Sequence, residues 1–501
     1  MPKSESKAAS SRPLDKALFA AGAQCAKRLY LEYHRPKLVP APSENQENLA
    51  EVGRELVEMA CKAFPKGEAM DTADFAAATR RTKEILEQAK PVVLFHAAFG
   101  HEGVEVRADI VLGGTDKSVM LYEVKSGTKV KPRHVQDVAL QIHVIEACGY
   151  KVRTASVLHL NPGFVHDGKG APPVQQLFKS VDITERARRH LERVRDQLGN
   201  FRAVLADRGS EDLPMGTWCH MPFRCVFYAH CREQAPEHPL VEMPDLTRSQ
   251  ESRWHEAGIE TMTRVDPQQP GLTLLQRRAL KAIETGGLVV EDFVRAEMAE
   301  LEHPVHLIHI GYLIDVLPRF ARSRPWQAIP FQWSSHVLHA DGKVEHRMYF
   351  HAEREDPRPA LVRALSDHVR GAGTVVVYGG QFEDRMRELL EDVPEHKADV
   401  RLLLNAPYID LQRLLRAGVY HPGFRGSFQL ADVAAGLGAP IAPTEDIADV
   451  DAASLAYARY LNTRTRANTR ERLKAGLEAF AKAQSQASLA ILRALLAVPA
   501  G

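Results

Sequence analysis

One segment, residues 107–141, constrains the fold most strongly, because it places charged groups inside an apolar pattern. It predicts a strand, a tight glycine turn at 113–114, a second strand, a basic loop and a helix. Side chains alternate between the two faces of a strand, so Glu123 and Lys125 point to the same face. The turn would place Asp109, which lies within an apolar run, beside Glu123 on the neighbouring strand.

Two carboxylates that converge in this way form a hard-oxygen site suited to Mg²⁺ or Mn²⁺. Such an ion supplies hydroxide near neutral pH and stabilises charge that develops on a phosphate. Lys125 would orient that water or stabilise the transition state. The E-x-K pattern also occurs at solvated strand edges, so the motif by itself leaves both interpretations open.

The spacing D-x13-E-x-K, followed by the helical segment Q-D-V-A-L-Q, resembles the PD-(D/E)XK nuclease superfamily and in particular its RecB-like branch. The resemblance implies that Asp109 and Glu123 hold the metal and that Lys125 is catalytic. It also implies that Gln141 lies beside the active site. On the helix predicted over 133–148, Gln141 lies outside the hydrophobic stripe.

Three cysteines follow at C-x5-C-x5-C spacing, namely Cys219, Cys225 and Cys231, in a segment that Pro222 bends. Zinc sites usually use C-x2-C knuckles, which this segment lacks. A four-thiolate cluster needs a fourth ligand, and Cys25 in AAGAQCAKRLYLEY is the best candidate. The residues alone leave zinc and free thiols open as alternatives.

One cysteine before the core and three after it is similar to the arrangement in iron-sulfur RecB-like nucleases, which include the CRISPR-associated adaptation nuclease and the AddB nuclease domain. The resemblance implies a 4Fe-4S cluster that ties the N-terminal helix to the end of the domain. Some relatives carry a histidine ligand on an early helix, where this chain offers only glutamates, Glu51, Glu55 and Glu58. Charged residues on an amphipathic helix usually face solvent.

The charge balance, 65 Lys and Arg against 64 Asp and Glu, gives a net charge of +1. A nucleic-acid surface must therefore be local, and the basic stretches 125–133 and 27–37 are candidates. Six cysteines are too few for a secreted disulfide scaffold. The N-terminus lacks an apolar signal core, and we expect a cytoplasmic protein without a membrane partner.

The 501 residues predict an α/β protein of several domains. The expected order is a disordered start (1–13), a restriction-endonuclease-like mixed-sheet nuclease domain with an iron-sulfur staple (14–235), a helical connector (236–303), an RNase H-like α/β domain (304–462) and an amphipathic C-terminal helix (463–501). A single helix is expected over 13–33 and another over 183–206.

The segments RPWQAIPFQWSSH, YGGQFED, DLQRLL and RGSFQLADV resemble an uncharacterised domain found after RecB-like nucleases, itself similar to DEDD-type exonucleases. In such exonucleases a D-x-E motif binds two metal ions, and the corresponding residues here are His309 and Gly311. Neither suits Mg²⁺, so we expect a catalytically degenerate domain. Later acids would be Glu383 and Asp410, with Asp315 as a substitute on the first strand.

These expectations together describe a Mg²⁺- or Mn²⁺-dependent deoxyribonuclease, an exonuclease acting on DNA with single-stranded ends, in repair, CRISPR adaptation or defence against mobile DNA. A second hypothesis is a non-catalytic nucleic-acid scaffold that acts with a partner nuclease or helicase. A third is a zinc-stabilised interaction protein. The C-terminal helix either forms a homo-oligomer or packs on its own domain.

Overall fold

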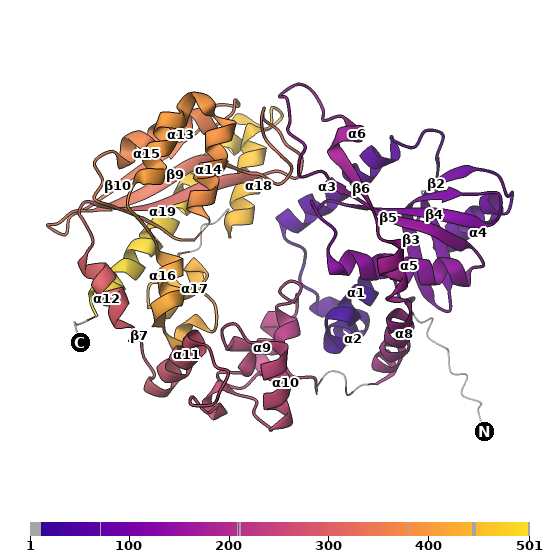
Figure 1. The fold of residues 1–501 in the computed structure, drawn as a ribbon, viewed down its shortest axis with the longest axis horizontal. Coiled ribbons are helices and arrows are strands. Elements are labelled where there is room, and N and C mark those ends of the chain that lie inside the picture. Colours follow the sequence, from indigo (N-terminus) through magenta and orange to yellow (C-terminus); the bar gives the residue numbers. More distant parts are fainter. Residues whose placement is uncertain are drawn as a thin grey trace. The chain divides into compact units, whose positions relative to one another are not determined.

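The computed structural model describes residues 12–70, 72–207, 209, 212–379, 381–442 and 447–498. Most of the segment expected to be disordered, 1–13, lies outside the described residues. The chain divides into two compact units, one of Met1–Phe164 with Lys169–Gln234 and one of Val165–Gly168 with Ala235–Gly501 (Figure 1).

The first unit is built on a sheet in which the strands follow the order β1-β2-β3-β4-β5-β6. The strands are β1 (Glu68–Ala69), β2 (Val92–His101), β3 (Val104–Gly113), β4 (Ser118–Lys125), β5 (Lys151–Leu160) and β6 (Phe178–Asp182). Strands β2, β3 and β4 are antiparallel, whereas β4 and β5 are parallel and are joined through α5 (Pro132–Ala147). The sheet is therefore mixed, as the sequence predicts.

The predicted glycine turn forms the β3–β4 hairpin. The strands pair from Ile110 opposite Tyr122 to Gly113 opposite Val119. The N–H of Gly114 donates to the carbonyl oxygen of Ser118 at 2.8 Å and closes the turn. The hairpin places Asp109 and Glu123 just beyond the end of this ladder.

Helix α5 lies on the sheet, where it contacts β2, β3 and β5. Its apolar stripe, which includes Val138 and Ile142, is completely buried. Helices α1 (Lys16–Gln24), α2 (Ala26–His34) and α8 (Leu191–Ala206) pack together, and α1 and α8 contact α5. The remaining helices of this unit are α3 (Glu44–Cys61), α4 (Phe75–Leu86), α6 (Val174–Leu177), α7 (Thr184–Arg188) and α9 (Tyr228–Gln234).

The single helix expected over 13–33 is wrong, because α1 ends and α2 begins at Cys25. Cys25 is extended, with φ −159° and ψ 132°. The N–H of Cys25 donates to the carbonyl oxygen of Ala21 in α1, and its own carbonyl oxygen accepts the N–H of Leu29 in α2. Cys25 therefore caps both of the helices that it separates. The helix expected over 183–206 is likewise divided into α7 and α8.

The second unit contains a sheet in the order β10-β9-β8-β11-β12. The strands are β8 (Val305–Ile314), β9 (Ala328–Leu338), β10 (Val344–Phe350), β11 (Thr374–Val377) and β12 (Tyr408–Asp410). The first three are antiparallel, and β11 runs parallel to β8 and β12.

Helices cover this sheet in two groups (Figure 1). Helices α13 (Arg358–Val369), α14 (Phe382–Asp392) and α15 (Lys397–Asn405) share a core with Ile308 and Ile310 of β8. Helices α18 (Val450–Leu461) and α19 (Ala467–Leu496) share another with Leu313 and Phe331. The C-terminal helix therefore packs on its own unit.

The segment expected as a connector belongs to the core of the second unit. Its helices are α10 (Arg248–Glu256), α11 (Leu274–Thr285) and α12 (Asp292–Ala299), which pack with α16 (Leu411–Gly418), α17 (Leu430–Gly436) and the end of α19. A small sheet pairs β7 (Val289–Val290) with β13 (Val419–Tyr420).

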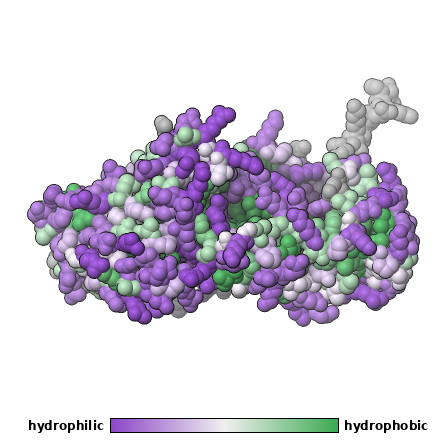
Figure 2. Space-filling view, turned by 90° about the horizontal axis from the view of Figure 1, so that it is seen from above, coloured by the Kyte–Doolittle hydropathy of each residue, from purple (hydrophilic) through white to green (hydrophobic). Residues whose placement is uncertain are grey.

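Hydrophilic residues dominate the face of the molecule shown in Figure 2, and hydrophobic residues are scattered among them. None of the described helices is both long and apolar enough to cross a lipid bilayer.

Candidate active site

The two predicted metal ligands meet at the end of the β3–β4 ladder. Asp109 is partly buried, and its Oδ2 accepts the N–H of Val124 at 2.7 Å, where a carbonyl oxygen would otherwise continue the ladder. Glu123 is 2 % exposed. The hairpin thus turns both carboxylates into one region, as the strand pattern predicts.

Lys125 and Gln141 both reach Glu123. The Lys125 ammonium donates to Glu123 Oε1 at 2.7 Å and to Asp137 Oδ2 at 2.6 Å. From α5, Gln141 Nε2 donates to Glu123 Oε2 at 2.9 Å. All four predicted residues therefore belong to one cluster, which also includes Asp137.

Lys16 is a member of this cluster that sequence reasoning missed. It is the first residue of α1, and its Nζ lies 2.7 Å from Glu123 Oε1 and 3.4 Å from Asp137 Oδ1. Lys16 is more than a hundred positions from Glu123 in the sequence, and no local pattern marks it. Asp137 had a signal, because it lies one helical turn before Gln141 on α5.

The charges and burial within the cluster shift the pKa values of the two predicted ligands, Asp109 and Glu123, in opposite directions. Burial, followed by the charge of Glu123, raises the pKa of Asp109 to about 7. Burial also acts to raise the pKa of Glu123, but the charges of Lys125 and Lys16 outweigh it and hold that pKa well below its usual range. Burial alone would lower the pKa of both lysines, yet the surrounding carboxylates raise it.

The donor set fits a hard divalent ion, since carboxylate and amide oxygens are the ligands that Mg²⁺ and Mn²⁺ prefer. Gln141 Oε1 is buried and has no hydrogen-bond partner among the described residues, so one amide oxygen of the cluster is unsatisfied. As the described side chains stand, no three His, Cys, Asp or Glu residues form a ligand set for a single ion. The two ammonium groups take the Glu123 oxygen that such a set would use.

The glutamates of α3 do not extend this site. Glu51, Glu55 and Glu58 are all exposed. The face of α3 that is buried is apolar and includes Leu56 and Ala60. An additional ligand from this helix is therefore not supported.

The four predicted cysteines line one pocket. Cys25 comes from the α1–α2 break, and the others come from residues 219–231. The rest of the lining is mostly apolar, with Leu31, Met215 and Phe227 among its members. Lys27 and Arg28 add positive charge beside it.

The pocket disfavours the thiolate form of three of these cysteines. Burial raises the pKa of Cys219 to about 12, and burial also raises the pKa of Cys225 and Cys231. Thiols kept neutral by burial are poor nucleophiles. Metal coordination would deprotonate them, and the neighbouring basic side chains would offset the resulting charge.

Packing fills the positions of His309 and Gly311, the two residues expected to correspond to the D-x-E motif. The ring of His309 lies against Phe480 of α19, with centroids 6.1 Å apart, and desolvation lowers the pKa of His309 to about 4. A Cβ on Gly311 would lie 2.7 Å from the side chain of Gln332. These positions therefore accommodate α19 and β9.

The later acids of the same unit have structural partners. Asp410 caps α16 by accepting the N–H groups of Gln412 and Arg413, and its Oδ1 also accepts that of Gly379 at 2.8 Å. Glu383 is half-buried and pairs with Arg387 on its own helix. Asp315 pairs with Arg319 at 2.7 Å. These acids do not assemble into a second metal site.

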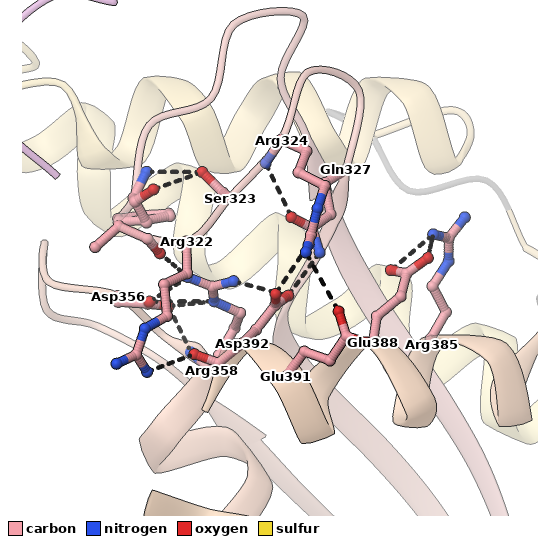
Figure 3. A network of polar contacts seen from close by, with 12 residues as sticks. Arg322, Ser323, Arg324, Gln327, Asp356, Arg358, Arg385, Glu388, Glu391 and Asp392 are labelled. Atoms are coloured by element: carbon pink, nitrogen blue, oxygen red, sulfur yellow. Dashed lines mark hydrogen bonds and ion pairs between the residues drawn. The ribbon is translucent and has the colours of Figure 1, made fainter. Parts of the chain in front are cut away.

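The RPWQ segment that supports the second resemblance has a structural role, shown in Figure 3. Asp392, at the end of α14, has a side chain that is 1 % exposed. It accepts from Arg324 at 3.0 Å and from Gln327 at 2.6 Å, and it lies 3.0 Å from Arg358. The motif therefore fixes α14 to the loop before β9.

The comparisons with known proteins bear on the second unit. The model of a family described as Domain of unknown function (DUF2779) matches residues 314–429, which include β9 to β12 and the Asp392 network. The chain is similar to that family over this stretch. No match to this chain was found among the curated proteins or the solved structures.

Proposed function

We propose that the first unit is a metal-dependent nuclease of the RecB-like PD-(D/E)XK type, acting on DNA. The observation that carries the proposal is the convergence of Asp109, Glu123, Lys125 and Gln141, from two strands and a helix, into one largely buried cluster. Three adjacent acids and two lysines are an unusual choice for a purely structural core, because burying each charge carries a desolvation penalty that lowers the stability of the fold unless the charge is paired.

In this proposal Asp109 and Glu123 are the metal ligands, and Gln141 orients Glu123 through its amide N–H. A divalent ion would supply hydroxide near neutral pH and stabilise charge on the phosphate. Lys125 contributes a positive charge close to the reacting phosphate, and Asp137 holds its ammonium group in place. The raised pKa of Asp109 fits a ligand whose charged form depends on a nearby cation.

We further propose that Cys25, Cys219, Cys225 and Cys231 hold a 4Fe-4S cluster with a structural role, which ties the α1–α2 break to the end of the unit. The shared pocket supports this assignment. For the second unit we propose an RNase H-like fold without catalytic metals. The strand order and the structural roles of Asp410 and Glu383 support it.

The test is cleavage of end-labelled single- and double-stranded DNA, and of matched RNA, by anaerobically purified protein with Mg²⁺ or Mn²⁺. Glu123→Gln and Lys125→Met should each reduce the rate by at least about 100-fold, because each removes a charge at the reacting phosphate or its metal. The product ladder would report polarity, and the RNA arm would report the choice of sugar.

Glu58→Gln is the matched control, since it neutralises an exposed glutamate of the same unit and should retain full activity. If the wild-type protein contains its iron-sulfur cluster yet cuts no substrate with either metal, the nuclease proposal is wrong. A non-catalytic nucleic-acid scaffold would then account better for the same cluster of residues.

A further inference from the structure

Lys16 belongs to the cluster around Glu123, here called the acidic cluster, but the proposed function assigns it no role. Its ammonium group lies 2.7 Å from Glu123 Oε1 and 3.4 Å from Asp137 Oδ1, and 3.5 Å from the carbonyl oxygen of Arg107. The Lys16 side chain is 27 % exposed, whereas that of Glu123 is 2 % exposed. Lys16 thus reaches from the edge of the cluster to its most buried acid.

Glu123 has both carboxylate oxygens engaged. Oε1 accepts from Lys16 and from Lys125, each at 2.7 Å, and Oε2 accepts from Gln141 at 2.9 Å. A divalent ion binds through such an oxygen and repels a nearby ammonium group, because like charges in a poorly solvated site interact strongly. Binding the ion through Oε1 therefore requires one lysine to withdraw.

The distances indicate which lysine withdraws. Lys125 has a second short contact, at 2.6 Å to Asp137, and its side chain is 22 % exposed. The second carboxylate contact of Lys16 is longer, at 3.4 Å, and its side chain is somewhat more exposed. By these contacts Lys16 is the less tightly held of the two lysines.

We propose that Lys16 is a competing cation of this site, which neutralises Glu123 in the metal-free protein and yields that oxygen to a divalent ion. The inference rests on the proposed function, because it uses the same metal ligands. Within the cluster two lysines face three acids, Asp109, Glu123 and Asp137. Lys16 therefore lowers the affinity of the site for metal while it stabilises the metal-free fold.

The experiment is the affinity of the purified full-length protein for Mn²⁺, measured by calorimetry and by electron paramagnetic resonance of free Mn²⁺. Lys16→Met should bind Mn²⁺ about tenfold more tightly than the wild type, because a competing charge in contact with a ligand has been removed. Lys16→Gln, a second neutral variant that keeps a hydrogen-bond donor, should behave similarly. Glu123→Gln identifies the site, since it should abolish this binding.

Two variants control for the charge. Lys16→Arg keeps a cation at the same position and should restore an affinity close to that of the wild type. Lys83→Met removes an exposed lysine of α4 and should leave the affinity unchanged. Thermal unfolding gives an independent readout, because Mn²⁺ should raise the melting temperature of Lys16→Met more than that of the wild type.

Unchanged or weaker Mn²⁺ binding in folded Lys16→Met and Lys16→Gln would overturn the inference and leave the nuclease proposal standing. If neither the wild type nor the neutral variants show binding that depends on Glu123, both proposals fall. Tighter binding in the neutral variants without cleavage of any nucleic acid would support the role of Lys16 and would contradict only the nuclease activity.

Discussion

At the scale of single residues, two buried acids of the chain, Glu123 and Asp392, differ in what surrounds them. Glu123 accepts from two ammonium groups and an amide, and both lysines are partly exposed. Asp392 is enclosed by planar donors, of which Arg358 is itself 1 % exposed (Figure 3). A site that exchanges cations needs access to solvent, whereas a structural pair does not.

Asp392→Ala should destabilise the second unit by about 3 kcal/mol, because it leaves Arg358 buried with fewer acceptors. Thermal or urea unfolding measures the loss. Glu391→Ala is the matched control on the same helix, since Glu391 is 77 % exposed and its ion pair with Arg324 should contribute less than about 1 kcal/mol. Equal losses in the two variants would contradict a structural role for the network.

At the scale of elements, helix α1 connects the charged cluster around Glu123 to the cysteine pocket of the first unit. Its first residue, Lys16, contacts Glu123, and Cys25 follows directly after its last residue. Gln24 Nε2 donates to the carbonyl oxygens of Trp218 and Phe223 in the cysteine segment, both at 2.9 Å. A nine-residue helix spans about 13 Å, so α1 joins the acidic cluster to the cysteine pocket over a short rigid path.

Strands β8 and β9 carry buried histidines that should make stability depend on pH. Burial, followed by the charge of His346, lowers the pKa of His336 to about 4, and burial lowers the pKa of His306. In the unfolded chain histidine titrates near its ordinary pKa of about 6.5. The stabilisation is therefore complete above pH of about 6.5 and is lost as the pH falls towards 4.

His336→Gln should make the free energy of unfolding depend less steeply on pH, because the variant has no imidazole ring to protonate. The slope should fall by at most about 1.4 kcal/mol for each pH unit. Melting temperatures between pH 7.5 and 4.5 provide the measurement. His339→Gln, which alters a more exposed histidine directly after β9, should change the slope less. A wild-type melting temperature that does not fall over this range would show that these histidines accept protons in the folded protein.

At the scale of the whole molecule, each unit has its own hydrophobic core, and the cysteine pocket of the first unit brings together residues distant in sequence. Cys25 precedes the sheet and Cys219, Cys225 and Cys231 follow it. A cluster bound by all four would restrict the unfolded chain and add binding energy to folding.

Cys231→Ser should abolish the visible absorbance and the bound iron and sulfide of anaerobically purified protein, and should lower the melting temperature of the first unit. Cys61→Ser is the control, because Cys61 is the last residue of α3 and does not line the pocket. Colourless wild-type protein with bound zinc would contradict the iron-sulfur assignment. Equal effects of the two substitutions would contradict the role of the pocket.

Much of the fold could be predicted from the sequence because local periodicity specifies it. The two strands predicted within 107–141 form β3 and β4, and the helix predicted over 133–148 differs from α5 by one residue at each end. Alternation placed Glu123 and Lys125 on one face, and the glycine turn brought Asp109 beside them. These features depend on residues within a few positions of one another, where backbone geometry fixes which side chains meet.

Other features depended on distant parts of the chain. Cys25 sits in a sequence with helical character, yet in the structure it is extended, separates α1 from α2 and lines the pocket. The sequence by itself determined the strand-turn-strand unit, the acids and lysine it carries and the grouping of three cysteines. Only the tertiary structure decided that Lys16 joins Glu123 and that α19 covers His309, because packing between remote elements leaves no periodic signal in the sequence.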